Sequence, residues 1–434
     1  MTGIVKNKWQ GLVALSPMIV FLLLYVVISI MIGDFYKIPI SVALLAASMW
    51  SIAVYRHKNL RERIEIFSRA AANSDIIYMI WIFVLAGAFA SVAKEIGAVE
   101  ATVSFTLGIF PPQYIVPTLF IAACLISFSI GTSVGTVVAL TPLAAELATA
   151  EGTNVAFFVG AVLGGAFFGD NLSFISDTTI AATRSQGCNM QDKFKVNLWI
   201  ALPAALVTLL VYVIVVPEVP ALDVAREGDI FMMLPYLVVI VSAVCGINVV
   251  IVLTGGIACA VVLGVIKGVN PIDLAGYMGS GIEGMGGLII ITLLASGMLG
   301  IIKASGGIEY ILELLTARIS GLRGAQAILA ALVGIVNLCT ANNTVAIITV
   351  GPLARDISRR FGVDSRKAAS ILDSASCIVQ CLIPYGAQTL LATSLAGISP
   401  AAPFPYLYYP WILAIAMVIS IIFLLPRRYS SVVK

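Results

Sequence analysis

Charged residues are scarce in this sequence, and histidine is almost absent. Among 434 residues, Asp, Glu, Lys and Arg make up 11%, and one residue is histidine. A soluble domain carries about 25% charged residues, so a water-soluble enzyme is excluded. The 25 basic and 22 acidic residues leave a net charge of +3, which excludes a nucleic-acid binder. A hydrophobic content of 60% excludes a disordered chain.

Other absences narrow the class further. Alternating apolar and polar ten-residue segments, the signature of outer-membrane barrels, are missing. The apolar run from about Leu12 to Ile32 lacks an Ala-x-Ala cleavage site and is too long for the core of a signal peptide, so we expect a first transmembrane helix there. The seven cysteines are odd in number and form no CxxC pair, which favours packing residues in a reduced compartment over disulfides or zinc ligands.

The chain contains apolar blocks instead. They run for roughly 17–25 residues, the length that crosses a bilayer as a helix. The expected fold class is therefore all-α, a polytopic protein of the cell membrane. Basic residues cluster in loops, whereas 149–157 and 394–408 contain no Lys or Arg. Because Lys and Arg collect on cytoplasmic loops, both termini are predicted to be cytoplasmic. The basic clusters lie in 56–69, 184–195, 355–367 and 427–434.

The sequence repeats itself at a distance of 210 residues. Pro142-Leu143-Ala144 returns as Pro352-Leu353-Ala354, and Thr179, Thr183 and Gly187 return as Thr389, Thr393 and Gly397. The basic segment 359–367 corresponds to 149–157, which has no basic residue, so equivalent loops lie on opposite sides. This predicts two inverted-topology repeats, the architecture of secondary transporters.

The repeat divides the chain into four parts. We expect an N-terminal two-helix segment with a basic cytoplasmic loop over 1–75, the first repeat over 76–215, connecting helices over 216–285, and the second repeat over 286–434. The loop 216–229 is mainly acidic. Within the first repeat, Gly160, Gly164, Gly165 and Gly169 predict close packing between helices.

Two polar interruptions occupy the same position of the two repeats. The first is Gly131-Thr132-Ser133-Val134-Gly135-Thr136, and the second is Thr340-Ala341-Asn342-Asn343-Thr344. A broken helix exposes backbone groups and the side chains add oxygens, so hard, oxygen-only ligation of Na⁺ is expected here. Each interruption is either the tip of a re-entrant hairpin, within 113–148 and 323–356, or the turn between two spans. The candidate ligands are Thr132, Ser133, Thr136, Asn342, Asn343 and Thr344.

A second polar cluster runs from Gly169 to Thr179 in an otherwise apolar span. Asp170 and Asp177 are seven residues apart, and we expect the helix to unwind between them. An ionised aspartate buried at this depth costs several kcal/mol unless a cation or a proton pairs with it. A carboxylate so placed can exchange H⁺ for Na⁺ on one site, which is the physical basis of antiport. The candidate residues are Asp170, Asn171, Ser173, Ser176, Asp177 and Thr178.

The matching segment of the second repeat is chemically different. Its only acid is Asp373, followed by Ser374, and Pro384 with Gly386 predicts a helix break before Gln388. The positions equivalent to Asp170 and Asp177 hold Gln380 and Ala387. The first half is thus rich in acids, and the second offers one acid and amides. Asp373, Ser374 and Gln388 complete the candidate site.

Three functions compete for these residues. In the first, Na⁺/H⁺ antiport, Asp170, Asp177 and Asp373 bind Na⁺ and protons. In the second, a Na⁺- or H⁺-coupled carrier, the interruptions bind a small organic solute, an amino acid or a carboxylate. The scarcity of intramembrane arginine, with Arg184 expected at the cytoplasmic edge, favours ions or a zwitterion over a dicarboxylate.

The third alternative, an intramembrane enzyme, has little support. Gly131-x-Ser133-x-Gly135 fits a nucleophile elbow, but a serine needs a base, and the sole histidine, His57, lies in a basic loop. We therefore expect no enzyme and no cofactor, only Na⁺ and H⁺ as transported or coupling ions. Membrane lipid is the other expected partner, and a homodimer is left open.

The string Gly169-Asp170-Asn171-Leu172-Ser173-Phe174-Ile175-Ser176-Asp177-Thr178-Thr179 resembles the Gly-Asp-x-x-Ser-x-x-Ser-Asp-Thr-Thr signature of the NhaC-type Na⁺/H⁺ antiporter family. The interruption at 131–136 and the elements Leu372-Asp373-Ser374 and Leu382-Ile383-Pro384 are similar to further family motifs. Asp373 stands where much of that family has Glu. The resemblance covers roughly residues 75–425 and implies an ion-transporter fold of two inverted repeats, with Na⁺ and H⁺ as coupled ions.

Overall fold

The computed structural model describes residues 8–27, 39–99, 101–102, 105, 111–173, 176–215, 230–245, 247–316 and 321–430. The acidic loop 216–229, Phe174 and Ile175 lie outside these residues. Every regular element in the described part of the chain is a helix, as the apolar blocks predict. Eight of these helical segments are long and apolar enough to cross a membrane. All seven cysteines are free.

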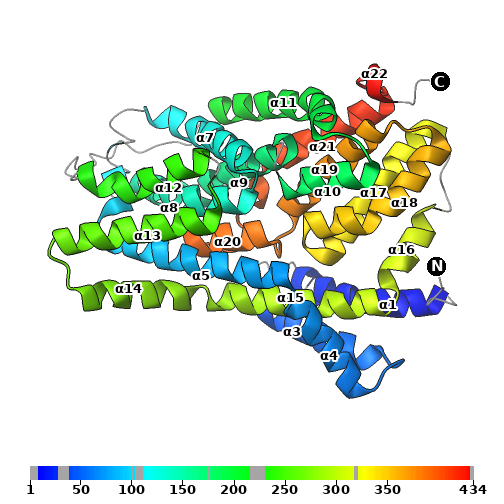
Figure 1. Cartoon of the computed structure of the whole chain (residues 1–434), viewed down its shortest axis with the longest axis horizontal. Coiled ribbons are helices and arrows are strands. Elements are labelled where there is room, and N and C mark those ends of the chain that lie inside the picture. The colour runs from blue at the N-terminus through cyan, green and yellow to red at the C-terminus, as the bar shows by residue number, and fades with distance from the viewer. Residues whose placement is uncertain are drawn as a thin grey trace.

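The first and the middle parts of the chain form one side of the molecule (Figure 1). α5 packs against α13 and α14, and α15 packs against α3 and α4. The elements are α1 (Lys8–Leu22), η1 (Leu23–Val27), α3 (Ile40–Val54), α4 (Leu60–Ala71), α5 (Ser74–Glu95), η3 (Ile230–Met233), α12 (Leu234–Val244), α13 (Val249–Ile266), α14 (Pro271–Gly284), α15 (Gly286–Ala304) and α16 (Gly307–Thr316).

The two repeats place their helices in the same order, and the central helices keep the same boundaries. In the first, η2 (Pro112–Tyr114) and α7 (Ile115–Ile130) precede α8 (Ser133–Ala150), α9 (Val155–Leu172), α10 (Asp177–Gln186) and α11 (Met190–Ile214). In the second, α17 (Gly321–Thr340) precedes α18 (Asn343–Phe361), α19 (Ser365–Leu382), α20 (Ala387–Ala396), η4 (Phe404–Tyr406), α21 (Tyr408–Ile422) and α22 (Arg427–Ser430). α19 and α20 begin and end 210 residues after α9 and α10, so the predicted repeat is confirmed.

Equivalent hydrogen bonds support the same register. Ser127 Oγ donates to Ala166 O at 2.5 Å, and 210 residues later Asn337 Nδ2 donates to Ser376 O at 2.7 Å. The packing between repeats is reciprocal, since α8 contacts α20 and α18 contacts α10. Such an exchange of partners is the property of a two-fold relationship.

The two broken helices run in opposite directions. At one side of the molecule, Asn154, which precedes α9, donates to Tyr406 Oη, beyond the end of α20, at 2.9 Å. At the other side, Gln186 at the end of α10 donates to Gly351 O of α18, and Gly187, which follows α10, lies beside the Arg355 guanidinium of α18, the helix that leads into α19. The α9–α10 and α19–α20 pairs are therefore antiparallel, and the repeats are inverted. We call the second side, which carries Arg355, the basic side, and the first the opposite side.

The helix pairs α7–α8 and α17–α18 are hairpins that enter from opposite sides. Ser127 of α7 lies beside α9, and the chain turns at Gly131 before α8 returns to the opposite side. α17 and α18 form the equivalent hairpin on the basic side, with its turn at Ala341. Gly131 and Ala341 both have positive φ, 73° and 47°. The turns contact Asp170 and Gln380 in the last turns of α9 and α19, next to the helix breaks, which favours the re-entrant alternative that loop charges leave open.

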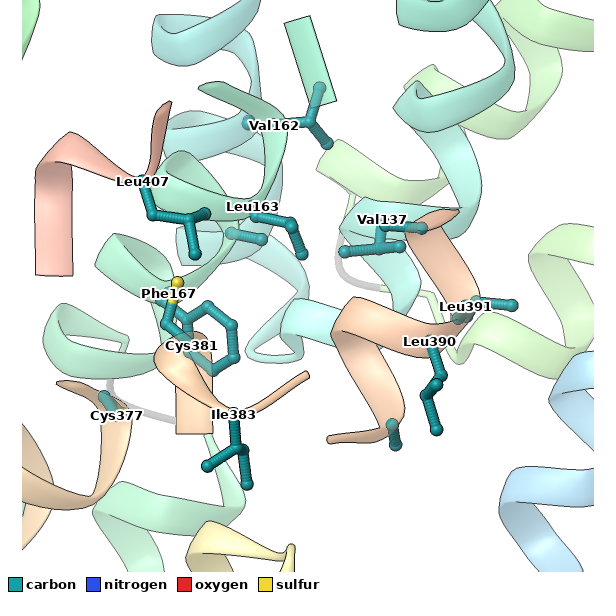
Figure 2. Close-up of a cluster of buried hydrophobic side chains, with 14 of the residues drawn as sticks. Val137, Val162, Leu163, Phe167, Cys377, Cys381, Ile383, Leu390, Leu391 and Leu407 are labelled. Carbon is teal, nitrogen blue, oxygen red and sulfur yellow. The ribbon is translucent and has the colours of Figure 1, made fainter. Parts of the chain in front are cut away.

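The core between the repeats is apolar and tightly packed. Val137 of α8, Phe167 of α9, Cys381 of α19 and Leu391 of α20 meet in one cluster (Figure 2). A side chain at Gly169 would place its Cβ 2.2 Å from Ser127 Cβ, and similar close approaches exist at the other three predicted packing glycines. The glycine stripe therefore brings α9 against α7 and the chain around Tyr406 and Tyr409, as the sequence predicts.

Candidate ion-binding site

Asp170 lies at the point where the tip of the first hairpin meets the broken helix. Its Oδ1 accepts a hydrogen bond from Ser133 N at 2.9 Å, and its Oδ2 accepts one from Ser133 Oγ at 2.5 Å. The side chain belongs to the last turn of α9 and is 4% exposed. The N-terminus of α8, with its partial positive charge, therefore faces a buried carboxylate.

The break between α9 and α10 is stabilised by hydroxyl groups. Ser176 caps α10 by accepting from Thr179 N at 3.2 Å. Thr179 Oγ1 donates to Ser173 O at 2.8 Å, and Thr178 Oγ1 donates to Asp170 O at 3.3 Å. The carbonyl groups of Asp170 and Ser173 are thus satisfied by short side chains, which lets the sequence unwind inside an apolar span.

A cavity of about 1240 Å³ reaches Asp170 from the basic side. Both hairpin tips line it, as do Asp177 and Gln380. Arg355 and Arg359 of α18 line it toward the basic side. Asp177 is exposed in this cavity, whereas the sequence led us to expect two buried aspartates; the N-terminal position of Asp177 on α10 accounts for the difference, since it places the carboxylate on the cavity wall.

The cavity brings together nine of the fifteen predicted site residues. They are Thr132, Ser133, Asp170, Asp177, Thr178, Asn342, Asn343, Thr344 and Gln388. Gln388 Nε2 donates to Ser133 Oγ at 3.1 Å, so the second repeat contacts the carboxylate's own donor. The other six predicted residues do not line the cavity, although they lie in the same helices or at their ends. They are Thr136, Asn171, Ser173, Ser176, Asp373 and Ser374.

Asp373 pairs with a lysine rather than with the other aspartates. Its Oδ2 lies 2.6 Å from Lys193 Nζ and accepts from Asn197 Nδ2 at 2.9 Å. Lys193 Nζ also donates to Asn171 O and to Thr179 Oγ1, both at 2.7 Å. Among the described residues, no group of three His, Cys, Asp or Glu side chains could hold a metal ion, so Asp170, Asp177 and Asp373 do not converge on one point.

Sequence reasoning missed Lys193 and Asn197. Lys193 lies in the basic segment 184–195 and is expected there to be a loop cation, but it is fully buried on α11. Its partner on α19 is remote in sequence, so no local pattern identifies the pair. The one local signal is its position at the start of a long apolar helix. Lys367, predicted in a loop, is likewise buried on α19, where it donates to Leu425 O at 2.8 Å.

Known proteins are similar to this chain in sequence and in fold. The chain is similar to the Na⁺/H⁺ antiporter NhaC of Alkalihalophilus pseudofirmus, with 25% identity over 76% of this chain and 78% of that protein. It is also similar to the malate-2H⁺/Na⁺-lactate antiporter of Bacillus subtilis, with 22% identity over 90% of each chain. The crystal structure of the Alcanivorax borkumensis YdaH transporter matches with a TM-score of 0.42 and 14% identity, over 84% of this chain and 88% of that one.

The family comparison covers nearly the whole molecule. The model of the Na⁺/H⁺ antiporter family matches residues 11–216 and 218–426, which include both hairpins and both broken helices. This chain belongs to the Na⁺/H⁺ antiporter family.

Proposed function

We propose that this chain exchanges Na⁺ for H⁺ across the cytoplasmic membrane, with Asp170 as the group that binds one or the other. The observation that carries the proposal is the buried Asp170 carboxylate, which is held by a hairpin tip at the inner end of a cavity between two inverted repeats. The family match and the relatives named NhaC support ion exchange. They do not favour the organic-solute alternative.

Burial couples the two ions. Asp170 without a bound cation or proton would leave a negative charge inside the protein, at a cost of several kcal/mol. The ionised and unoccupied carrier is therefore rare, and the site changes sides loaded with Na⁺ or with H⁺. Because one carboxylate cannot hold both, arrival of one ion displaces the other.

The groups around Asp170 suit Na⁺. Carboxylate, hydroxyl and amide oxygens are hard ligands, and Asp177, Thr132 and Asn342 line the same cavity. Lys193 already neutralises Asp373, so we assign Asp373 to the stabilisation of α11 on α19 and Asp170 to the transported ion. Na⁺ and H⁺ are substrates in this proposal, and no resident cofactor is needed.

The basic side faces the cytoplasm in this proposal. Arg355, Arg359, Arg360 and Arg366 lie on or next to the basic end of α18, and Lys and Arg favour the cytoplasmic surface. The cavity then opens inward. α1 and α22 lie at the same end of the molecule in Figure 1, which supports cytoplasmic termini.

Proteoliposomes test the exchange directly. Purified protein is reconstituted in Na⁺-free vesicles containing a pH dye, and Na⁺ is added outside. Na⁺ entry coupled to H⁺ exit makes the lumen alkaline, and Asp170→Asn abolishes this signal. Asp192→Asn is the matched control, because Asp192 lies on α11 outside the cavity and pairs with the exposed Lys195 at 3.7 Å. Normal exchange by Asp170→Asn would contradict the proposal, as would exchange that requires an added organic solute.

A further inference from the structure

Gln380 is the counterpart of Asp170 in the second repeat. It lies 210 residues later, in the last turn of α19, and is 1% exposed. Like Asp170, it lines the cavity. The two-fold relationship thus places an acid and an amide at equivalent positions of two inverted halves.

The hydrogen bonds of Gln380 fix the orientation of its amide. Nε2 donates to Ala341 O at 3.0 Å and to Gln388 Oε1 at 2.9 Å. Both partners are acceptors, so the group facing them must be the NH₂. Gln380 Oε1 points elsewhere and has no hydrogen-bond partner among the described residues, although it is buried.

A buried acceptor without a donor is costly unless something positive meets it. Gln380 Oε1 differs from the other unpaired amide oxygens because its residue lines the cavity together with Asp170. Gln388 connects the two sites, since it accepts from Gln380 and donates to Ser133, the residue that holds Asp170. A carboxylate and an unpaired amide oxygen can both coordinate a cation.

We propose that Gln380 Oε1 is a ligand of the Na⁺ that Asp170 binds. The inference rests on the proposed function and adds a ligand from the second repeat. It also distinguishes the two loaded states. Na⁺ needs several oxygens and joins the two repeats through Asp170 and Gln380, whereas a proton on Asp170 needs no ligand from Gln380. Gln380 therefore selects for the metal ion and leaves proton binding unaffected.

The test uses Gln380→Met, which keeps the side-chain volume and removes the oxygen. We expect the KM for Na⁺ to rise about tenfold, as for the loss of one interaction of ~1.4 kcal/mol, while kcat at saturating Na⁺ stays near wild type. The ratio of the KM values for Li⁺ and Na⁺ also changes, because the shell loses a ligand of fixed position. A purely structural role would not move that ratio.

Gln326→Met is the matched control. Gln326 is also buried with an unpaired Oε1, and its Nε2 donates to a backbone carbonyl, Ser430 O, at 3.1 Å, but it does not line the cavity. We expect its KM values to stay at wild type. An unchanged KM for Na⁺ in Gln380→Met, or an equal shift in both variants, overturns the inference.

The inference and the proposed function fail separately. If Asp170→Asn is inactive and Gln380→Met has a normal KM and Li⁺/Na⁺ ratio, the proposed function stands and the role of Gln380 falls. If Asp170→Asn still exchanges the ions, the proposed function falls, and the inference falls with it. Should Gln380→Met fold poorly, Gln380→Leu takes its place, with the same expected rise in the KM for Na⁺, and an unchanged KM overturns the inference.

Discussion

Lys193 and Asp373 form an ion pair at 2.6 Å with both side chains almost completely removed from solvent. Asp373 is one of the three acids that the sequence predicted to bind Na⁺, and its cation is supplied by the protein. Lys193 directs its three N–H groups to Asp373, Asn171 O and Thr179 Oγ1. One ammonium therefore connects α11 and α19 with both sides of the break between α9 and α10.

We expect removal of either partner to destabilise the protein. Lys193→Met leaves a buried carboxylate unpaired, which costs about 3–5 kcal/mol. The double variant Lys193→Met/Asp373→Leu recovers most of that loss because no charge remains. Thermal unfolding of the detergent-solubilised protein measures both effects. Lys195→Met serves as the control, since Lys195 is exposed. A double variant no more stable than the single one would contradict a charge-based explanation.

Competition at Asp170 predicts a link between pH and Na⁺ affinity. Below the pKa of the Asp170 carboxyl, each decrease of one pH unit lowers its ionised fraction about tenfold. The KM for Na⁺ therefore rises about tenfold for each unit that the pH falls. Initial rates of exchange across a pH series give this slope. Na⁺ also stabilises the folded protein by mass action, and Asp170→Asn loses that stabilisation. A KM independent of pH would separate the proton site from Asp170.

Gly169→Ala is expected to disrupt the contact between α7 and α9. The added Cβ would lie 2.2 Å from Ser127 Cβ, too close for any two carbon atoms that are not bonded. Overpacking of this kind costs typically about 1–3 kcal/mol, and we expect a lower unfolding temperature. The control is Gly276→Ala on α14, where nothing lies within 4 Å of the new carbon. Equal unfolding temperatures for the two variants would show that α7 and α9 separate easily.

Glu151 predicts a pH dependence of stability. It lies in the loop between α8 and α9, is 4% exposed, and burial raises its pKa from 4.5 to about 7. The folded protein then binds a proton between these values that the unfolded chain does not, so stability falls as pH rises through this range, by up to ~3 kcal/mol. Glu151→Gln removes this contribution. The difference in unfolding temperature between pH 5 and pH 8 should be smaller for the variant than for wild type.

Access from one side can be measured with thiol reagents. After replacement of the native cysteines, Arg355→Cys in the cavity should react with a membrane-impermeant reagent applied to the cytoplasmic face. Glu146→Cys, on α8 near the opposite side, should react only from outside. Labelling of both positions from the same face would contradict the inverted arrangement of the hairpins.

Local patterns predicted the helices and both breaks. Glycine, proline and hydroxyl residues interrupt long apolar stretches, and a membrane span tolerates an irregular backbone only where it is buried in protein or lines a cavity. The repeat could also be recognised in the sequence, because its two copies align without a gap. The aligned stretch runs from the start of α8 to the end of α10, and from the start of α18 to the end of α20. Asp170 and the residues of both hairpin tips could therefore be selected from the sequence.

The contacts between side chains from different helices could not be predicted from the sequence. Lys193 looks like a loop cation by its neighbours, and only the tertiary structure shows that α19 supplies its acid. The sequence identified Gln380 as the counterpart of Asp170 but not as a site residue, since its significance depends on which of its atoms are already hydrogen-bonded. Loop charges could not distinguish a re-entrant hairpin from a pair of full spans either, because both place their loops on the same side of the membrane.

The 210-residue correspondence has an electrical consequence. If the carrier reaches its outward-open form by exchanging the conformations of the two halves, the outer vestibule is lined by the counterparts of the inner one. In the outer vestibule the counterparts of the three inner arginines are uncharged: Ala145 replaces Arg355, Thr149 replaces Arg359 and Ser394 replaces Arg184. The counterpart of Asp356 is Glu146. The inner mouth is cationic and the outer mouth neutral to acidic, so a sodium ion meets a different potential on each face of the membrane.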